Sequence, residues 1–149
     1  MLSTRLVKLI ESHAEELASG LVAHLKTHPR TASYRRFSDA ELRARAYAIY
    51  HNLGAWLAEK SEEAIRKEWE QLGRRRCADG VPFSEVIYAL VVVKNHLLDY
   101  IQTAAEHGTS LEVFGELELV MQVVRFFDHT AYFTAVGYEE ARRGSKSVA

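Results

Sequence analysis

Cysteine, proline and glycine are scarce in this chain of 149 residues, which contains one cysteine, two prolines and eight glycines. The single cysteine, Cys77, excludes an internal disulfide and a cysteine-rich metal site. So few turn-forming residues are atypical of a many-stranded β-sandwich. The longest apolar run, Val86–Val93, is far shorter than the roughly 20 residues of a membrane-spanning helix, and the N-terminus lacks the apolar core of a signal peptide. We therefore expect a cytoplasmic protein without a membrane partner.

An excess of basic residues is also lacking, because 19 Lys and Arg stand against 20 Asp and Glu, for a formal net charge of −1. Nucleic-acid-binding domains usually carry a clear basic excess, so we expect no nucleic-acid partner. Apolar residues, in contrast, are plentiful at 48%, enough at this length to bury one core. We predict a single domain over residues 1–149, in which residues 144–149 form a frayed tail.

Apolar residues recur every three to four positions and divide the chain into about five predicted helices. The first runs from Ser3 to His28, where Pro29 disfavours further helix. A capping box of Ser38 and Glu41 begins the second. A polar connection is expected between these two helices.

The third predicted helix spans residues 61–78 and ends in three arginines, which suit the negative end of a helix dipole. The fourth opens at Val81–Pro82 and is apolar on two faces, which indicates a core helix that lies between others. The fifth runs from Ser110 to about Arg143. The expected fold class is therefore all-α, a bundle of about five helices with a long C-terminal helix.

The last predicted helix carries two apolar stripes. One contains Phe114, Leu117, Met121 and Val124, and the second, displaced around the axis, contains Val113, Val120 and Phe127. At 1.5 Å per residue this helix is roughly 50 Å long, longer than a small domain is wide. Two stripes therefore indicate that it packs on its own core and on a second copy of the chain. We expect a homodimer with the second stripe at its interface, which Val120→Asp would dissociate while leaving helicity intact.

Motifs for catalysis are missing, since the sequence contains neither a G-x-S-x-G elbow nor a glycine-rich phosphate loop. Cys77 follows three arginines, but no base is assigned to it, so it is not indicated as a catalytic nucleophile. His24 and His28 share one helical face, yet a metal site needs at least a third ligand. The same pair also suits a helix C-terminus electrostatically. We expect neither enzymatic activity nor a bound metal.

His96 lies on the second apolar face of the core helix, together with Tyr100. One interpretation makes His96 a haem ligand or the polar anchor of a small-molecule pocket. The other makes it a buried histidine whose ring nitrogens are simply hydrogen-bonded. His96, Tyr100 and Cys77 are the pocket candidates that the sequence offers.

Two segments resemble a known family. Residues 72–90 (LGRRRCADGVPFSEVIYAL) contain a Gly-x6-Gly-x-Pro helix junction, and residues 124–140 (VRFFDHTAYFTAVGYEE) contain aromatic residues around an aspartate and a tyrosine. Together they resemble the N-terminal domain of the RsbR/RsbRD family, the RsbT co-antagonists of bacterial stress signalling. The resemblance implies a globin-like fold without haem that dimerises through its first and last helices. It also implies an output partner, a STAS domain or a kinase, and a signal relayed down the last helix.

The same resemblance bears on haem, because in globin-type sensors the proximal histidine lies on the helix before the core helix. Here that segment, residues 61–78, contains no histidine, and its nearest candidate ligand is Cys77. We therefore expect a regulatory or sensor domain without a cofactor. Two alternatives stay open: a haem-based gas sensor that uses His96 or Cys77, and a purely structural dimerisation module without a ligand.

Overall fold

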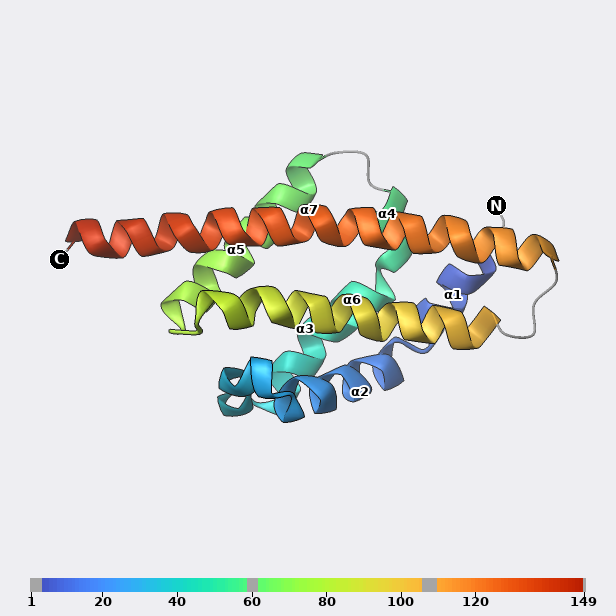
Figure 1. The fold of residues 1–149 in the computed structure, drawn as a ribbon, viewed down its shortest axis with the longest axis horizontal. Coiled ribbons are helices and arrows are strands. Elements are labelled where there is room, and N and C mark those ends of the chain that lie inside the picture. Colours follow the sequence, from blue (N-terminus) through green and yellow to red (C-terminus); the bar gives the residue numbers. More distant parts are fainter. Residues whose placement is uncertain (1–3, 59–61, 106–109, 149) are drawn as a thin grey trace.

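The computed structural model describes residues 4–58, 62–105 and 110–148, with side chains for residues 4–58, 62–104 and 115–144. Within these ranges the chain is helical and contains no strand (Figure 1). The elements in chain order are α1 (Thr4–Ser12), α2 (Ala14–Thr27), the 3-10 helix η1 (Pro29–Arg36), α3 (Asp39–His51), α4 (Leu53–Ala58), α5 (Glu62–Ala78), α6 (Phe83–Ala105) and α7 (Ser110–Val148). The predicted all-α class and the long C-terminal helix are confirmed, and α7 continues past Arg143, where we expected it to end.

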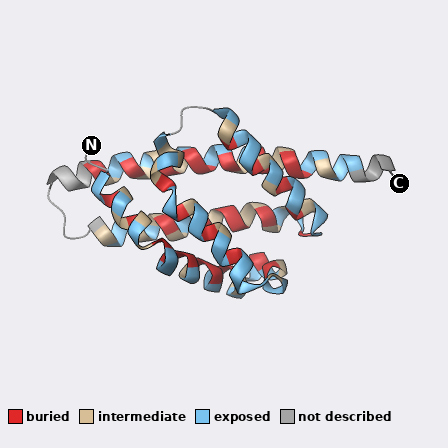
Figure 2. Cartoon of the chain, turned by 180° about the vertical axis from the view of Figure 1, so that it is seen from behind, coloured by how far each residue is buried: buried red, intermediate tan, exposed pale blue. Residues whose placement is uncertain are grey.

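The helix α6 lies between α7 on one side and α2 on the other (Figure 1). Its buried residues recur along its whole length and include Val86, Ala89, Leu90, Val92, Val93, Leu97 and Ile101. Figure 2 shows buried residues mainly on the inward sides of the helices and exposed residues on their outer sides. The prediction that this segment is the core helix is therefore confirmed.

The first predicted helix is interrupted at His13 and the second at Asn52. At both positions a side chain bonds to the backbone carbonyl four residues earlier: His13 Nδ1 to Leu9 at 2.9 Å, and Asn52 Nδ2 to Ala48 at 2.8 Å. Side chains that take up such carbonyls offer the backbone an alternative to continuing the helix. Hydrophobic periodicity continues across both breaks, so it does not reveal them.

The predicted polar connection after Pro29 is the 3-10 helix η1, which contributes buried side chains to the core. Thr31 is fully buried and its hydroxyl donates to the carbonyl of Leu25 at 2.7 Å, while Tyr34 is also buried. The predicted cap of the next helix is present, since the amide of Glu41 donates to Ser38 Oγ at 3.1 Å. The connection therefore packs as an element of its own.

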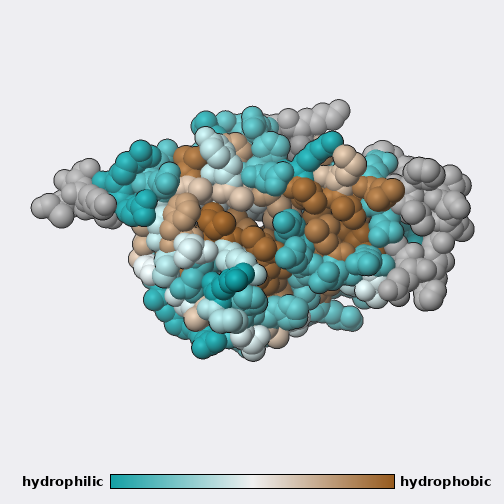
Figure 3. All heavy atoms as spheres, viewed as in Figure 1, coloured by the Kyte–Doolittle hydropathy of each residue, from teal (hydrophilic) through white to brown (hydrophobic). Residues whose placement is uncertain are grey.

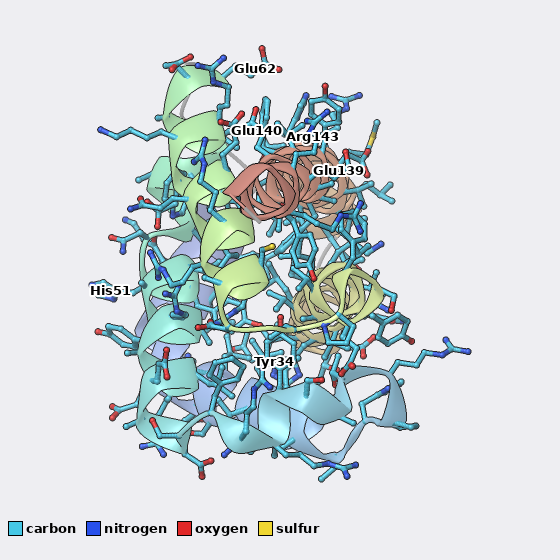
Figure 4. All side chains as sticks on the ribbon, turned by 90° about the vertical axis from the view of Figure 1, so that its left-hand side faces the viewer. Tyr34, His51, Glu62, Glu139, Glu140 and Arg143 are labelled. Carbon is cyan, nitrogen blue, oxygen red and sulfur yellow. The ribbon has the colours of Figure 1, made fainter. Side chains whose placement is uncertain are left out.

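The helices α5 and α7 cross at a point where both backbones approach closely (Figures 1 and 4). A Cβ atom on Gly73 would lie 2.0 Å from the carbonyl oxygen of Thr134, and one on Gly137 would lie 2.0 Å from that of Glu70. Glycine is required at both positions because no side chain fits between the helices. This crossing places α7 against α5.

Candidate functional site

A cavity of about 500 Å³ lies between α3, α5 and α6, and residues of α2, η1 and α4 complete its wall. Small-molecule sites in proteins typically have volumes of roughly 300–1,000 Å³. The wall is mostly apolar and includes Leu25, Leu42, Ile49, Trp56, Trp69, Leu72, Val86, Leu90 and Val93. The size and the apolar wall make this cavity the candidate binding site of the chain.

Both tryptophans of the chain line the cavity. The rings of Trp56 and Trp69 meet edge to face with centroids 4.7 Å apart, and Phe126 of α7 meets Trp69 in the same geometry at 5.3 Å. Edge-to-face contacts of this kind stabilise aromatic clusters beyond the burial of their area. The cluster links α4, α5 and α7, so the wall of the cavity includes residues that contact the long helix directly.

A buried cation is part of the cavity wall. Arg76 on α5 is 3% exposed and donates to Asp79 Oδ2 at 3.2 Å. Its guanidinium carbon lies 4.6 Å from the centre of the Phe37 ring and 5.5 Å from that of Tyr34, which adds cation–π attraction. The charge of Arg76 is therefore balanced within the chain.

Tyr34 lies between the helices at this end of the molecule (Figure 4). Burial raises the pKa of its hydroxyl to about 12, against the opposing effect of the neighbouring Arg76 charge. The hydroxyl is therefore neutral at ordinary pH. Tyr34 contributes a polar but uncharged group to the wall.

Two further charged residues line the cavity on facing helices, Arg45 on α3 and Glu68 on α5. Arg45 is half-buried and forms no hydrogen bond or ion pair with any other residue that the structure describes. Glu68, in contrast, is exposed and therefore hydrated. Arg45 is therefore the half-buried charged residue of this cavity that forms no ion pair with another described residue.

His96 does not line the cavity, although the sequence offered it as a pocket residue. It packs against α2, where its ring meets that of His24 with centroids 5.2 Å apart, and the space beside it exists because residue 20 is glycine. Burial lowers the pKa of His96, and the neighbouring His24 lowers it further. Its Nε2 is buried without a partner among the described residues, so the hydrogen-bonded interpretation holds for only part of the ring.

The other two pocket candidates lie elsewhere. Tyr100 faces His13 with ring centroids 6.3 Å apart, and burial raises the pKa of its hydroxyl. Cys77 is half-buried on α5, near Tyr138 of α7. The structure therefore brings none of the three to the cavity. The tryptophans that do line it were predicted only as positions on apolar stripes, and Arg76 only as one of three arginines at a helix end. Arg45 was not predicted as a site residue.

Two residues of the stripe predicted to face a second copy contact the core of the chain itself. Phe127 is 4% exposed and belongs to the core of the chain itself, and Val120 is half-buried against the same core. Leu117 and Met121 are 56% and 53% exposed, and Figure 3 shows hydrophobic surface on this face mainly in the band between α7 and α6. Val113 lies in the part of α7 whose side chains are outside the described residues.

Among the described residues, no group of three or more histidines, cysteines and acidic residues is placed to hold a metal ion. No described helix combines the length and the apolar character needed to cross a bilayer.

The sequence profile of the RsbT co-antagonist protein RsbRD N-terminal domain matches residues 14–147, from the start of α2 to the last turn of α7. The chain belongs to this family. As an RsbRD N-terminal domain, it is a sensor domain of the RsbR type of stress signalling. No curated protein and no solved structure matches the chain significantly.

Proposed function

We propose that this RsbRD N-terminal domain is a homodimeric relay that works without haem and without catalysis, and that passes a signal along α7 to an output partner of the STAS or kinase type. The observation that carries the proposal is the apolar outer surface of α7. Among the described residues, the large exposed hydrophobic side chains are Tyr47 of α3 and three residues of α7: Leu117, Met121 and Tyr132.

These three residues of α7 share one side of the helix. At 100° per residue, positions 117, 121 and 132 fall within about 60° around the helix axis. The exposed Asp128 falls in the same sector and separates Leu117 and Met121 from Tyr132 along the helix. Exposed apolar side chains of this kind are typical of a surface that a partner covers. A second copy of the chain presents the same stripe, so a two-fold pairing of α7 with α7 covers both at once.

The opposite side of α7 is held on the body of the domain. The hydroxyl of Tyr138 donates to the carbonyl of Val81 in the turn between α5 and α6, and Arg74 bonds to Glu140 at 3.2 Å. Together with the glycine crossing, these contacts make α7 move with α5. Because one helix carries both the dimer surface and these anchors, a shift of the body changes the geometry of the dimer.

The absence of haem and of catalysis is supported by where the candidate residues lie. Neither His96 nor Cys77, the two haem ligands that the sequence offered, lines the cavity. Cys77 faces α7, and His96 faces α2. The residues at the cavity thus fit binding of an organic molecule better than ligation of an iron.

The dimer is tested by adding charge to the exposed stripe. Sedimentation of the unchanged chain at micromolar concentration should give a dimer, and the double variant Leu117→Glu, Met121→Glu should give a monomer with the same helical circular dichroism. Tyr47→Glu is the control, because it places a glutamate at an exposed apolar position of α3 and should leave the dimer intact. A monomeric unchanged chain, or a double variant that stays dimeric, would show that α7 does not form the interface.

A further inference from the structure

The cavity combines a large apolar wall with one unbalanced cation, and this combination points to a class of ligand. Of its charged residues, Arg76 is neutralised by Asp79 at 3.2 Å and Glu68 is exposed to water. Arg45 is half-buried, and no described residue supplies a counter-ion for it. A partly desolvated charge without a partner is costly, and binding an anion there removes that cost.

The guanidinium of Arg45 is suited to one anion in particular. Its planar arrangement of donors matches a carboxylate, which accepts two parallel hydrogen bonds from it. The adjoining wall is formed by Trp56, Trp69 and aliphatic side chains, which favour an apolar body. A ligand with a cationic head group is disfavoured. The acidic residue that it would pair with, Glu68, is already hydrated, whereas Arg45 is only partly hydrated.

We propose that the cavity binds an apolar monocarboxylate, with its carboxylate on Arg45 and its hydrocarbon body between Trp56 and Trp69. Binding at this site does not depend on the dimer. The further step, that this ligand is the signal relayed by α7, rests on the proposed function. The physical link is the aromatic cluster, in which Trp69 contacts both the cavity and Phe126 of α7.

Intrinsic tryptophan fluorescence reports on this site, because the chain has two tryptophans and both line the cavity. The probes are 4-phenylbutyrate and its neutral amide, which share one apolar body and differ in the charge of the head group. We expect a saturable fluorescence change with the acid, and binding of the amide that is roughly tenfold or more weaker, as expected for loss of a charged hydrogen bond.

The position of the carboxylate is tested by Arg45→Gln against Arg43→Gln. Both substitutions remove one positive charge from α3, but Arg43 is exposed and does not line the cavity. Arg45→Gln should lower the affinity for the acid to that for the amide, and Arg43→Gln should leave the affinity for the acid unchanged. Equal affinity of acid and amide, or equal loss in both arginine variants, would overturn the assignment of Arg45.

The location in the cavity is tested by filling it with Ala46→Leu, or with Ala89→Leu should the first variant not fold. Both alanines line the cavity, and either substitution should abolish the saturable change. Unaltered binding in a folded, filled variant would overturn the site. The same titration on the double variant Leu117→Glu, Met121→Glu separates the two proposals, because ligand binding should persist there even though the dimer is lost.

Discussion

Tyr50 and His96 face each other in the interior with ring centroids 6.4 Å apart, and neither the Tyr50 hydroxyl nor Nε2 of His96 has a hydrogen-bond partner among the described residues. Tyr50 is fully buried, and burial raises the pKa of its hydroxyl. Two unpaired polar atoms at one place in a core reduce stability, because each has lost water without gaining a partner.

Removing one of these atoms should therefore be tolerated. Tyr50→Phe is expected to leave the free energy of unfolding unchanged or to raise it, because the hydroxyl forms no bond that is lost. Tyr138→Phe is the control, since that hydroxyl donates to the carbonyl of Val81 and its removal should cost about 1 kcal/mol or more. Urea unfolding of both variants measures the difference. An equal cost for the two would mean that the Tyr50 hydroxyl is satisfied.

Stability should depend on pH through His96. Its pKa is lowered in the folded chain by burial and then by His24, while in the unfolded chain it is near 6.5. Between these two values the unfolded chain binds more protons, so protonation of His96 reduces stability as the pH falls below about 7. The stabilisation that comes from keeping His96 neutral is complete above about pH 6.5. It is lost as the pH falls through the pKa that His96 has in the folded chain.

The contribution of His96 is isolated by the variant His96→Gln. We expect the stability of the unchanged chain to fall more than that of the variant between about pH 7.5 and pH 5.5 in urea unfolding. The groups around His96, namely His24, Asp99 and Tyr50, are retained in both proteins. Parallel pH profiles for the two would show that His96 does not titrate differently in the folded state.

The helix crossing should not accept a methyl group. Gly73→Ala and Gly137→Ala each place a Cβ atom 2.0 Å from a carbonyl oxygen of the other helix, and overpacking of this kind costs about 1–3 kcal/mol or more. Gly144→Ala is the control, because nothing lies within 4 Å of its added Cβ atom and alanine favours helix over glycine by about 1 kcal/mol. In thermal unfolding, the melting temperature of the Gly144→Ala control should equal or exceed that of the unchanged chain. Equal melting temperatures for all three variants would mean that the helices are further apart.

Haemin should not assemble with the chain. The absorption spectrum after addition of haemin is expected to show only free haemin, because His96 and Cys77 lie away from the cavity. A Soret band at one haem per chain that is lost in His96→Ala or Cys77→Ala would establish the gas-sensor alternative. The spectrum is best recorded beside that of a protein without a haem site.

The position of Val120 in the structure changes the expected effect of one substitution. From the sequence, Val120→Asp was expected to dissociate a dimer and keep the fold. Because Val120 is half-buried against the chain's own core, the substitution should instead lower the stability of the monomer, whereas Leu117→Asp should not. The two stripes of α7 are similarly apolar, and composition alone does not tell which one faces inward.

Helix identity, the Ser38 cap, the core position of α6 and the family were all predictable from the sequence, because periodicity, capping and motifs are properties of neighbouring residues. The breaks at His13 and Asn52, the burial in η1 and the rotation of α7 were not. They depend on which elements meet in space. The cavity belongs to this second group, since residues of α3, α4 and α5 line it together only in the folded chain: Arg45, Trp56, Trp69 and Arg76. The rotation of each helix about its own axis is set by the packing of all its neighbours at once, so only the tertiary structure decides which side chains share a site.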